Sequence, residues 1–175
     1  NIYNKLGKYQ PALDDYSSAI RINPDYAIAY YNRGNIYNKL GKYQPALDDY
    51  SSAIRINPDY AIAYYNRGNI YNKLGKYQPA LDDYSRAIRI NPDNPDNPDD
   101  AKAYDNRGIV KWHLKLEYCN DFKRACDLGQ CDNYNKGCKW IALWSLLWKE
   151  KGENKTNWKV TLLTLTTRQI HKSQS

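Results

Sequence analysis

A 34-residue unit repeated without a single change is the feature that most constrains this chain. Asn1–Gly34 recurs letter for letter as Asn35–Gly68, and a third copy follows in which Arg86 replaces a serine. The third copy also gains six residues in the run NPDNPDNPD at 91–99, and a divergent fourth copy begins at Ala101. A period of this length is typical of arrays in which each supersecondary unit packs only on its neighbours. The chain is therefore expected to fold as a stack of units.

Each unit contains two patterns of helical periodicity. Tyr30, Gly34 and Tyr37 lie at i, i+4 and i+7, which places them on one face of a helix. Leu-Gly-Lys at 40–42 ends that pattern, and Pro45 suits the first turn of a following helix. The apolar stripe of this second helix is formed by Ala46, Leu47, Tyr50, Ala53 and Ile54. Each unit is thus predicted to be a helical hairpin that buries its stripe against its neighbours.

Phased from Ala27, the unit closely resembles the tetratricopeptide repeat (TPR), and the resemblance extends from residue 1 to about residue 130. The signature positions of that family fall on Tyr30, Gly34, Tyr37, Ala46, Tyr50, Ala53 and Pro58, and again on Tyr64, Gly68, Tyr71, Ala80, Tyr84, Ala87 and Pro92. The resemblance implies an all-α solenoid of antiparallel helix hairpins. It also divides the chain into a partial unit at 1–26, units at 27–60 and 61–100, a divergent unit at 101–130, and a capping helix with a basic tail at 131–175.

The first copy begins at the ninth position of the motif, so it lacks the leading half of its first helix. The chain also begins at Asn1 and contains no methionine. We therefore expect a fragment boundary here, with further repeats upstream. The Gly-Lys pairs at 7–8, 41–42 and 75–76 are all interpreted as turns between helices. Each is followed by tyrosine rather than serine or threonine, which argues against a phosphate-binding loop.

In the family, the first helices of successive hairpins line a concave groove, and the resemblance places a set of polar and aromatic residues there. These are Tyr31, Asn32, Asn35, Asn38, Lys39, Tyr65, Asn66, Asn69, Asn72, Lys73, Lys102 and Asn106. Because asparagine carries both a donor and an acceptor, a ladder of Asn32, Asn66 and Asn106 beside Tyr31 and Tyr65 is suited to hold an extended peptide. The alternative is a hydrated helix face. The leading prediction is a non-catalytic scaffold that binds a peptide or a partner helix.

Some family members capture a C-terminal carboxylate with a clamp of lysine, arginine and asparagine. This chain supplies Asn35, Asn66 and Lys102 at three of the clamp positions, but Tyr31 and Asn106 stand where two cations are expected. The sequence therefore argues against a working carboxylate clamp.

An arginine occupies a family position that is usually apolar, at Arg33, Arg67 and Arg107. The sequence favours a structural role in which the aliphatic stem is buried and the guanidinium reaches a carboxylate such as Asp48 or Asp49.

The formal charge of +7 is concentrated at one end of the chain. Residues 1–108 carry 14 basic against 13 acidic side chains, whereas residues 109–175 carry 12 against 6. The array itself is nearly neutral, so nucleic acid is not an expected partner. No nucleophile motif accompanies His113 or His171, and we expect neither enzymatic activity nor a cofactor.

The four cysteines, Cys119, Cys126, Cys131 and Cys138, lack the C-x-x-C spacing of a zinc site. Free thiols in a cytoplasmic protein are the favoured interpretation, with a disulfide pair or zinc binding that involves His113 as alternatives.

The segment 139–149 carries Trp140, Trp144 and Trp148 at i, i+4 and i+8 with leucines between them. This helix is too short to span a bilayer. It is predicted to cap the open end of the array, with membrane-surface binding and oligomerisation as alternatives. The tail after it is expected to be loosely ordered, with a strand-like stretch at 160–167. The run at 91–99 is expected to form a passive loop, with a hinge as the alternative.

Overall fold

The computed structural model describes residues 2–91 and 98–138 of the chain. Its elements are α1 (Ile2–Ile22), α2 (Ala27–Lys39), α3 (Tyr43–Ile56), α4 (Ala61–Lys73), α5 (Tyr77–Ile90), α6 (Pro98–His113), α7 (Cys119–Asp127) and a short π-helix, η1 (Tyr134–Cys138). Every regular element in these ranges is helical, as predicted. The Trp-rich segment 139–149, the stretch 160–167 and residues 92–97 of the NPD run lie outside the described residues.

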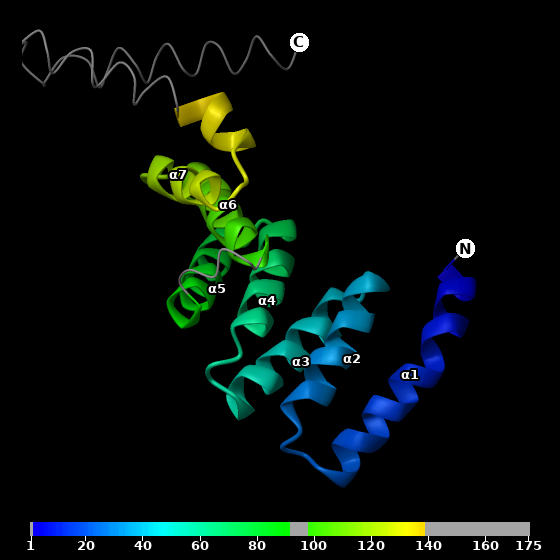
Figure 1. The fold of residues 1–175 in the computed structure, drawn as a ribbon. Helices are drawn as coiled ribbons and strands as arrows, with labels where there is room; N and C mark the ends of the chain where they lie inside the picture. The colour runs from blue at the N-terminus through cyan, green and yellow to red at the C-terminus, as the bar shows by residue number, and fades with distance from the viewer. Residues whose placement is uncertain (1, 92–97, 139–175) are drawn as a thin grey trace, which may run out of the picture.

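Successive helices pair into hairpins, α2 with α3, α4 with α5 and α6 with α7. The hairpins follow one another in a row, with α1 at one end and α7 and η1 at the other (Figure 1). This arrangement confirms the predicted all-α solenoid of antiparallel hairpins. The last Pro-Asp of the NPD run belongs to α6, since proline suits the first position of a helix.

The core between the hairpins is built from small side chains and a few large ones. Gly34 lies where any Cβ would approach the Tyr50 ring to 3.0 Å, and Gly68 stands in the same relation to Tyr84. Both tyrosines are completely buried. The absence of a side chain at these glycines therefore lets the first helix of a hairpin lie directly against the tyrosine of the second.

Glycine also closes the turns inside the hairpins. Gly41 and Gly75 adopt φ values of +74° and +68°, and Gly129 ends α7 with a φ of +97°. This left-handed region is readily accessible to glycine and costs energy for other residues. The predicted turns at 41–42 and 75–76 are therefore confirmed.

The predicted turn at Gly7-Lys8 is wrong, because α1 runs unbroken from Ile2 to Ile22 through this pair. Only six residues of this sequence precede Gly7, which is less than two turns of helix. The covering residues that α2 supplies to α3, among them Arg33 and Gly34, have no counterpart in those six. Without that packing, the segment gains little by folding back and continues as one helix.

Candidate functional site

At two junctions of the array, an arginine joins three helices. Arg33 in α2 donates two hydrogen bonds to Asp49 of α3, Nη2 to Oδ1 at 2.7 Å and Nε to Oδ2 at 2.9 Å. Its Nη1 also donates to the Ser17 hydroxyl of α1 at 3.0 Å. Arg67 in α4 repeats the arrangement with Asp83 of α5 and Ser51 of α3. The predicted arginine–carboxylate pair is confirmed.

The divergent fourth unit keeps the pair although its second helix has changed. Arg107 donates to both carboxylate oxygens of Asp121, at 2.7 and 2.9 Å, and Lys111 adds a second ion pair at 2.9 Å. Phe122 replaces the tyrosine of the other units and remains buried. The arginine–carboxylate pair therefore forms with either tyrosine or phenylalanine after the aspartate.

These carboxylates lie in the interior, where an unpaired charge would be costly. Asp49, Asp83 and Asp121 are only 4 to 5% exposed. The hydrogen bond to Asp49 raises the pKa of Arg33 above its ordinary value. Burial raises the pKa of Asp83, although Arg67 opposes this shift. Removal of one partner from such a pair destabilises a protein by about 3–5 kcal/mol, because the other charge stays buried.

A second network, of asparagine and tyrosine, connects the first helices of successive hairpins. The Tyr50 hydroxyl donates to Asn35 Oδ1 at 2.7 Å. The same oxygen accepts a bond from Asn66 Nδ2 of α4 at 3.3 Å, and Asn66 Nδ2 also donates to the Tyr31 hydroxyl at 3.1 Å. The two helices α2 and α4 are therefore joined through amide groups.

The same network recurs one unit further along. Tyr84 donates to Asn69 Oδ1 at 2.8 Å, and Asn106 Nδ2 of α6 donates to Asn69 Oδ1 at 3.1 Å and to the Tyr65 hydroxyl at 3.3 Å. The structure thus brings together Tyr31, Asn35 and Asn66, and separately Tyr65, Asn69 and Asn106.

Two further predicted residues contact the buried hydroxyls. Burial raises the pKa of Tyr50 well above its ordinary value of 10.0, and the hydrogen bond with Asn38 acts in the opposite direction. Asn72 does the same for Tyr84. Asn38 and Asn72 therefore make polar contacts with tyrosine hydroxyls that are buried in the core.

The geometry leaves one half of each amide directed outward. Asn35 Oδ1 accepts two bonds from within the protein, and Asn66 Nδ2 donates two. No hydrogen bond of the described residues uses Asn35 Nδ2 or Asn66 Oδ1, and no buried side-chain polar atom there lacks a partner. Solvent therefore reaches a donor on Asn35 and an acceptor on Asn66. Asn69 and Asn106 present the same pair.

Four predicted site residues remain. Asn32 is half-buried, and Lys39, Lys73 and Lys102 are exposed. Lys73 Nζ lies 5.9 Å from the centre of the Tyr43 ring. The hydrogen bonds of the structure join Asn35 with Asn66 and Asn69 with Asn106. The ladder of Asn32, Asn66 and Asn106 as a peptide-binding surface stays a prediction.

Asp105 stands at the position that Tyr31 and Tyr65 occupy in the other units. It is buried, and both of its carboxylate oxygens accept bonds from Asn133 Nδ2 at 2.9 Å. Burial raises the pKa of Asp105. The row of tyrosines along the first helices therefore ends at α6, where residues 131–138 return onto the array. Nothing in the spacing of Asn133 signalled this contact.

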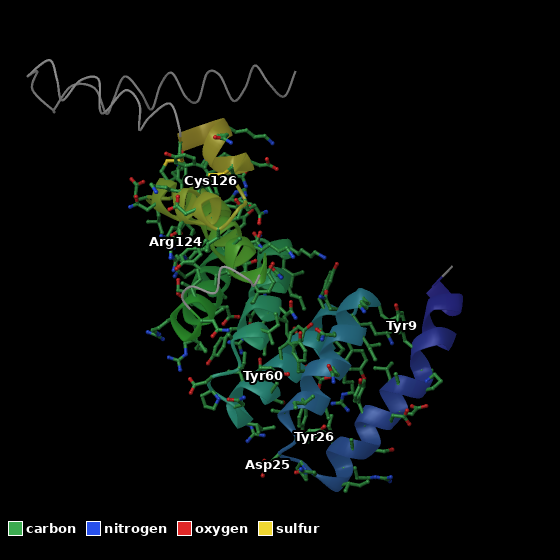
Figure 2. The ribbon with its side chains drawn as sticks, in the orientation of Figure 1. Tyr9, Asp25, Tyr26, Tyr60, Arg124 and Cys126 are labelled. Atoms are coloured by element: carbon green, nitrogen blue, oxygen red, sulfur yellow. A yellow bond between two sulfur atoms is a disulfide. The ribbon has the colours of Figure 1, made fainter. Side chains whose placement is uncertain are left out.

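The prediction of free thiols is wrong, because all four cysteines are paired. Cys119 bonds to Cys138 and Cys126 to Cys131, with sequence separations of 19 and 5. Figure 2 shows Cys126 at the end of the array, close to η1. Disulfides require that the Cα atoms approach to within about 7 Å, and only the return of 131–138 onto α7 brings them together. The cytoplasmic location stays a prediction. Reduced thiols, which are typical of the cytosol, no longer support it.

No helix within residues 2–91 and 98–138 is both long and apolar enough to cross a membrane.

Stacked helical hairpins with a 34-residue period, joined by one repeated set of contacts, define an α-solenoid repeat protein. Two family models match the chain, one described as Tetratricopeptide repeat over residues 61–94 and one as TPR repeat over residues 1–41 and 34–75. Together these matches cover more than half of the chain. The chain belongs to the tetratricopeptide repeat family.

Solved structures with the same fold include YrrB, MamA and the first TPR of Spaghetti. The TPR protein YrrB, "with an unusual peptide-binding site", matches with a TM-score of 0.60 and 26% identity over 69% of this chain and 60% of its own. MamA matches with a TM-score of 0.61 and 27% identity over 72% of this chain and 67% of its own. The first TPR of Spaghetti (RPAP3), bound to the HSP90 peptide SRMEEVD, gives a TM-score of 0.56 and 29% identity over 65% of this chain and 85% of its own. No curated protein matches significantly in sequence.

Proposed function

We propose that the chain is a non-catalytic interaction scaffold that binds an extended peptide along the face shared by α2, α4 and α6. The observation that carries this proposal is the outward donor and acceptor on each asparagine pair. Asn35 Nδ2 and Asn66 Oδ1 offer the two groups that one peptide unit needs, an acceptor for its N–H and a donor for its carbonyl. Asn69 and Asn106 offer the same two groups one hairpin further along.

The inward bonds make this arrangement well suited to binding. Because Tyr50 and Tyr31 hold the amides in place, little side-chain entropy is lost when a peptide binds. The two sites have identical chemistry, so a suitable partner is long, repetitive, or recognised through its backbone. Weak contacts at two linked sites add to a useful overall affinity.

The structural relatives support a peptide partner without indicating its sequence. YrrB is described with a peptide-binding site, and the Spaghetti domain was solved with a peptide. This chain has Tyr31 and Asn106 at two positions where a carboxylate clamp needs cations. We therefore propose recognition of internal peptide groups rather than of a free C-terminus.

The test uses an isosteric change that affects only the outward half of the amide. Asn35→Asp together with Asn69→Asp keeps the oxygen that accepts from Tyr50 and Tyr84 and replaces the outward donor by an acceptor. Peptides of twelve residues selected from a random display library against the full chain are the probes. We expect their affinity, measured by calorimetry, to fall at least about tenfold in this variant, since two donors are lost.

The matched control places the same two charges elsewhere. Asn23 and Asn57 occupy equivalent turns, where each Oδ1 accepts a backbone N–H at 3.1 Å. Asn23→Asp with Asn57→Asp keeps that bond and is expected to leave the affinity unchanged. If no peptide is enriched, or if the enriched peptides bind the Asn35→Asp, Asn69→Asp variant as tightly as the parent chain, the proposal is wrong.

A further inference from the structure

Residues 131–138, called the strap below, follow α7, end in η1 and lie against α6 and α7. Asn133 Nδ2 in the strap donates to both carboxylate oxygens of Asp105 in α6, each at 2.9 Å. At the same register of α2, the Tyr31 hydroxyl accepts a bond from Asn66 of the following unit, and α4 repeats this contact with α6. The strap therefore supplies to α6 the amide donor that the next first helix supplies to α2 and α4.

The carboxylate under the strap differs from the other buried carboxylates of the described residues. Each of the others, Asp49, Asp83 and Asp121, is paired with an arginine of its own hairpin. Asp105 is 6% exposed and bonds to the neutral amide of Asn133 instead. A carboxylate that is enclosed in this way needs hydrogen-bond donors, because it has lost its contact with water. The strap therefore both covers Asp105 and provides its donor.

The strap has little packing of its own to hold it in this place. Within it, only Cys138 is buried. The π-helix η1 has five residues, and so short a helix is not stable by itself. One disulfide fastens each end of the strap to α7, Cys131 to Cys126 and Cys138 to Cys119. Because such crosslinks restrict the open forms of the chain, the closed position of the strap depends on them.

We propose that the strap is a redox-controlled cover, which keeps Asp105 closed while its disulfides are intact and opens it when a dithiol reduces them. Opening makes the carboxylate available to a hydrogen-bond donor from outside the chain. The cover is thus closed in an oxidising compartment and open in a reducing one. This proposal does not rest on the peptide-binding surface proposed above, because its readout is the carboxylate rather than a bound peptide.

The chemistry of opening is thiol–disulfide exchange. A thiolate of the dithiol attacks one sulfur of a cystine, the S–S bond breaks, and a mixed disulfide forms. The second thiol of the dithiol then displaces the remaining protein thiolate, so that the dithiol is oxidised to a disulfide. Each cystine gains two electrons and two protons and becomes two cysteine thiols. Cys119, Cys126 and Cys131 are only half-buried, so a small dithiol can approach both disulfides.

The test measures how fast Asp105 of the full chain reacts with a water-soluble carbodiimide and glycine ethyl ester, which convert accessible carboxylates into amides. Mass spectrometry of proteolytic fragments locates and quantifies the modification. We expect Asp105 to react at least about tenfold faster after the chain is reduced with dithiothreitol and its thiols are capped with iodoacetamide, because the cover is then open. A reduced sample that is reoxidised with glutathione disulfide, instead of capped, should react slowly again.

Two other carboxylates of the same chain are internal controls. Asp121 is buried in α7 beside Arg107, so it should react slowly in both samples as long as the α6–α7 hairpin stays folded. Asp82 is exposed and should react quickly in both.

A variant without the disulfides separates their loss from other effects of the reductant. Asp105 should react quickly in this variant with or without dithiothreitol. The variant combines four changes, Cys119→Ser, Cys126→Ser, Cys131→Ser and Cys138→Ser.

Three outcomes would overturn the proposal. The first is an equal rate at Asp105 before and after reduction, because the disulfides would then not control the cover. The second is a parallel acceleration at Asp121, which would mean that the whole hairpin unfolds and that the strap does not open separately. The third is a slow reaction of Asp105 in the four-serine variant, because the strap would then stay closed without its disulfides.

Discussion

Residues 2–22 and 36–56 have the same sequence and different structures. The first segment forms one continuous helix, α1, whereas the second forms the end of α2, a turn at Gly41 and the whole of α3. Local propensity is identical in the two places, so it cannot decide between them. The hairpin turn of this repeat therefore depends on tertiary contacts.

Those contacts are absent from the first segment. Folding at Gly41 lets Asp49 pair with Arg33 and lets Tyr50 pack below Gly34. The segment before Gly7 brings no arginine and no such glycine to Asp15 and Tyr16. Continuing the helix through Gly7 costs only about 1 kcal/mol, because a glycine is tolerated inside a helix. At Gly41, a continuous helix would instead lose the contacts of Asp49 and Tyr50, which costs more than that.

The largest contrast is expected between Asp49 and Asp15. Asp49→Ala should lower the free energy of unfolding by about 3 kcal/mol or more, because Arg33 loses its buried partner. Asp15→Ala, at the equivalent exposed position, should change it by no more than about 0.5 kcal/mol. Urea denaturation followed by circular dichroism measures both. Equal losses would mean that α1 and α3 are covered alike.

Replacing the turn glycines should give effects of opposite sign. Gly41→Ala forces a side chain into the left-handed region, at φ +74°, and should destabilise the chain by about 1–2 kcal/mol. Gly7→Ala lies inside α1 and should stabilise the chain by about 0.5–1 kcal/mol. Thermal melting of the two single variants tests this contrast. A loss of stability in Gly7→Ala would indicate a turn at residue 7.

The buried tyrosines predict a dependence on alkaline pH. Burial raises the pKa of Tyr50 and Tyr84 above the ordinary value of 10.0, so the folded chain holds these protons more tightly than the unfolded chain. Stability is therefore fully present below pH 10 and is lost as the pH rises above it, by about 1.4 kcal/mol per pH unit for each tyrosine. Denaturant melts between pH 8 and 11.5 measure this slope. A double replacement of these tyrosines by phenylalanine should reduce it.

The smallest contrast concerns one hydroxyl group. Tyr50→Phe removes the bond to Asn35 and should cost about 1 kcal/mol. Tyr16→Phe in α1 should have an effect of less than about 0.5 kcal/mol. Paired denaturation curves in one buffer resolve this difference, and a reversed order of the two variants would contradict it.

The regular hairpins could be predicted because their pattern is local and redundant. Helical periodicity, a turn glycine and a proline all point to the same boundaries around Gly41 and Pro45. The salt bridge of Arg33 could also be predicted, since a buried guanidinium needs a carboxylate. The sequence pattern does not show whether Arg33 pairs with Asp48 or with Asp49, because this choice depends on the angle between α2 and α3.

Other features depended on contacts between distant residues. The straight α1 could not be foreseen from Gly7, whose neighbours match those of Gly41 through residue 22. The disulfide of Cys119 with Cys138 depends on the path of 131–138. The asparagines were expected to offer a bound peptide both the donor and the acceptor of each amide. The structure turns one half of Asn35 and Asn66 inward, because successive first helices lie close enough for their amides to bond.

The hydrogen bond from each of these arginines to a serine of the preceding unit affects how the array unfolds. Arg33 connects α1 to α3 through Ser17 and Asp49, and Arg67 connects α3 to α5 through Ser51 and Asp83. In a linear array, the strength of such nearest-neighbour coupling decides whether units melt singly or together. The two arginines thus add nearest-neighbour coupling along α1, α3 and α5, which favours melting of these helices together rather than singly.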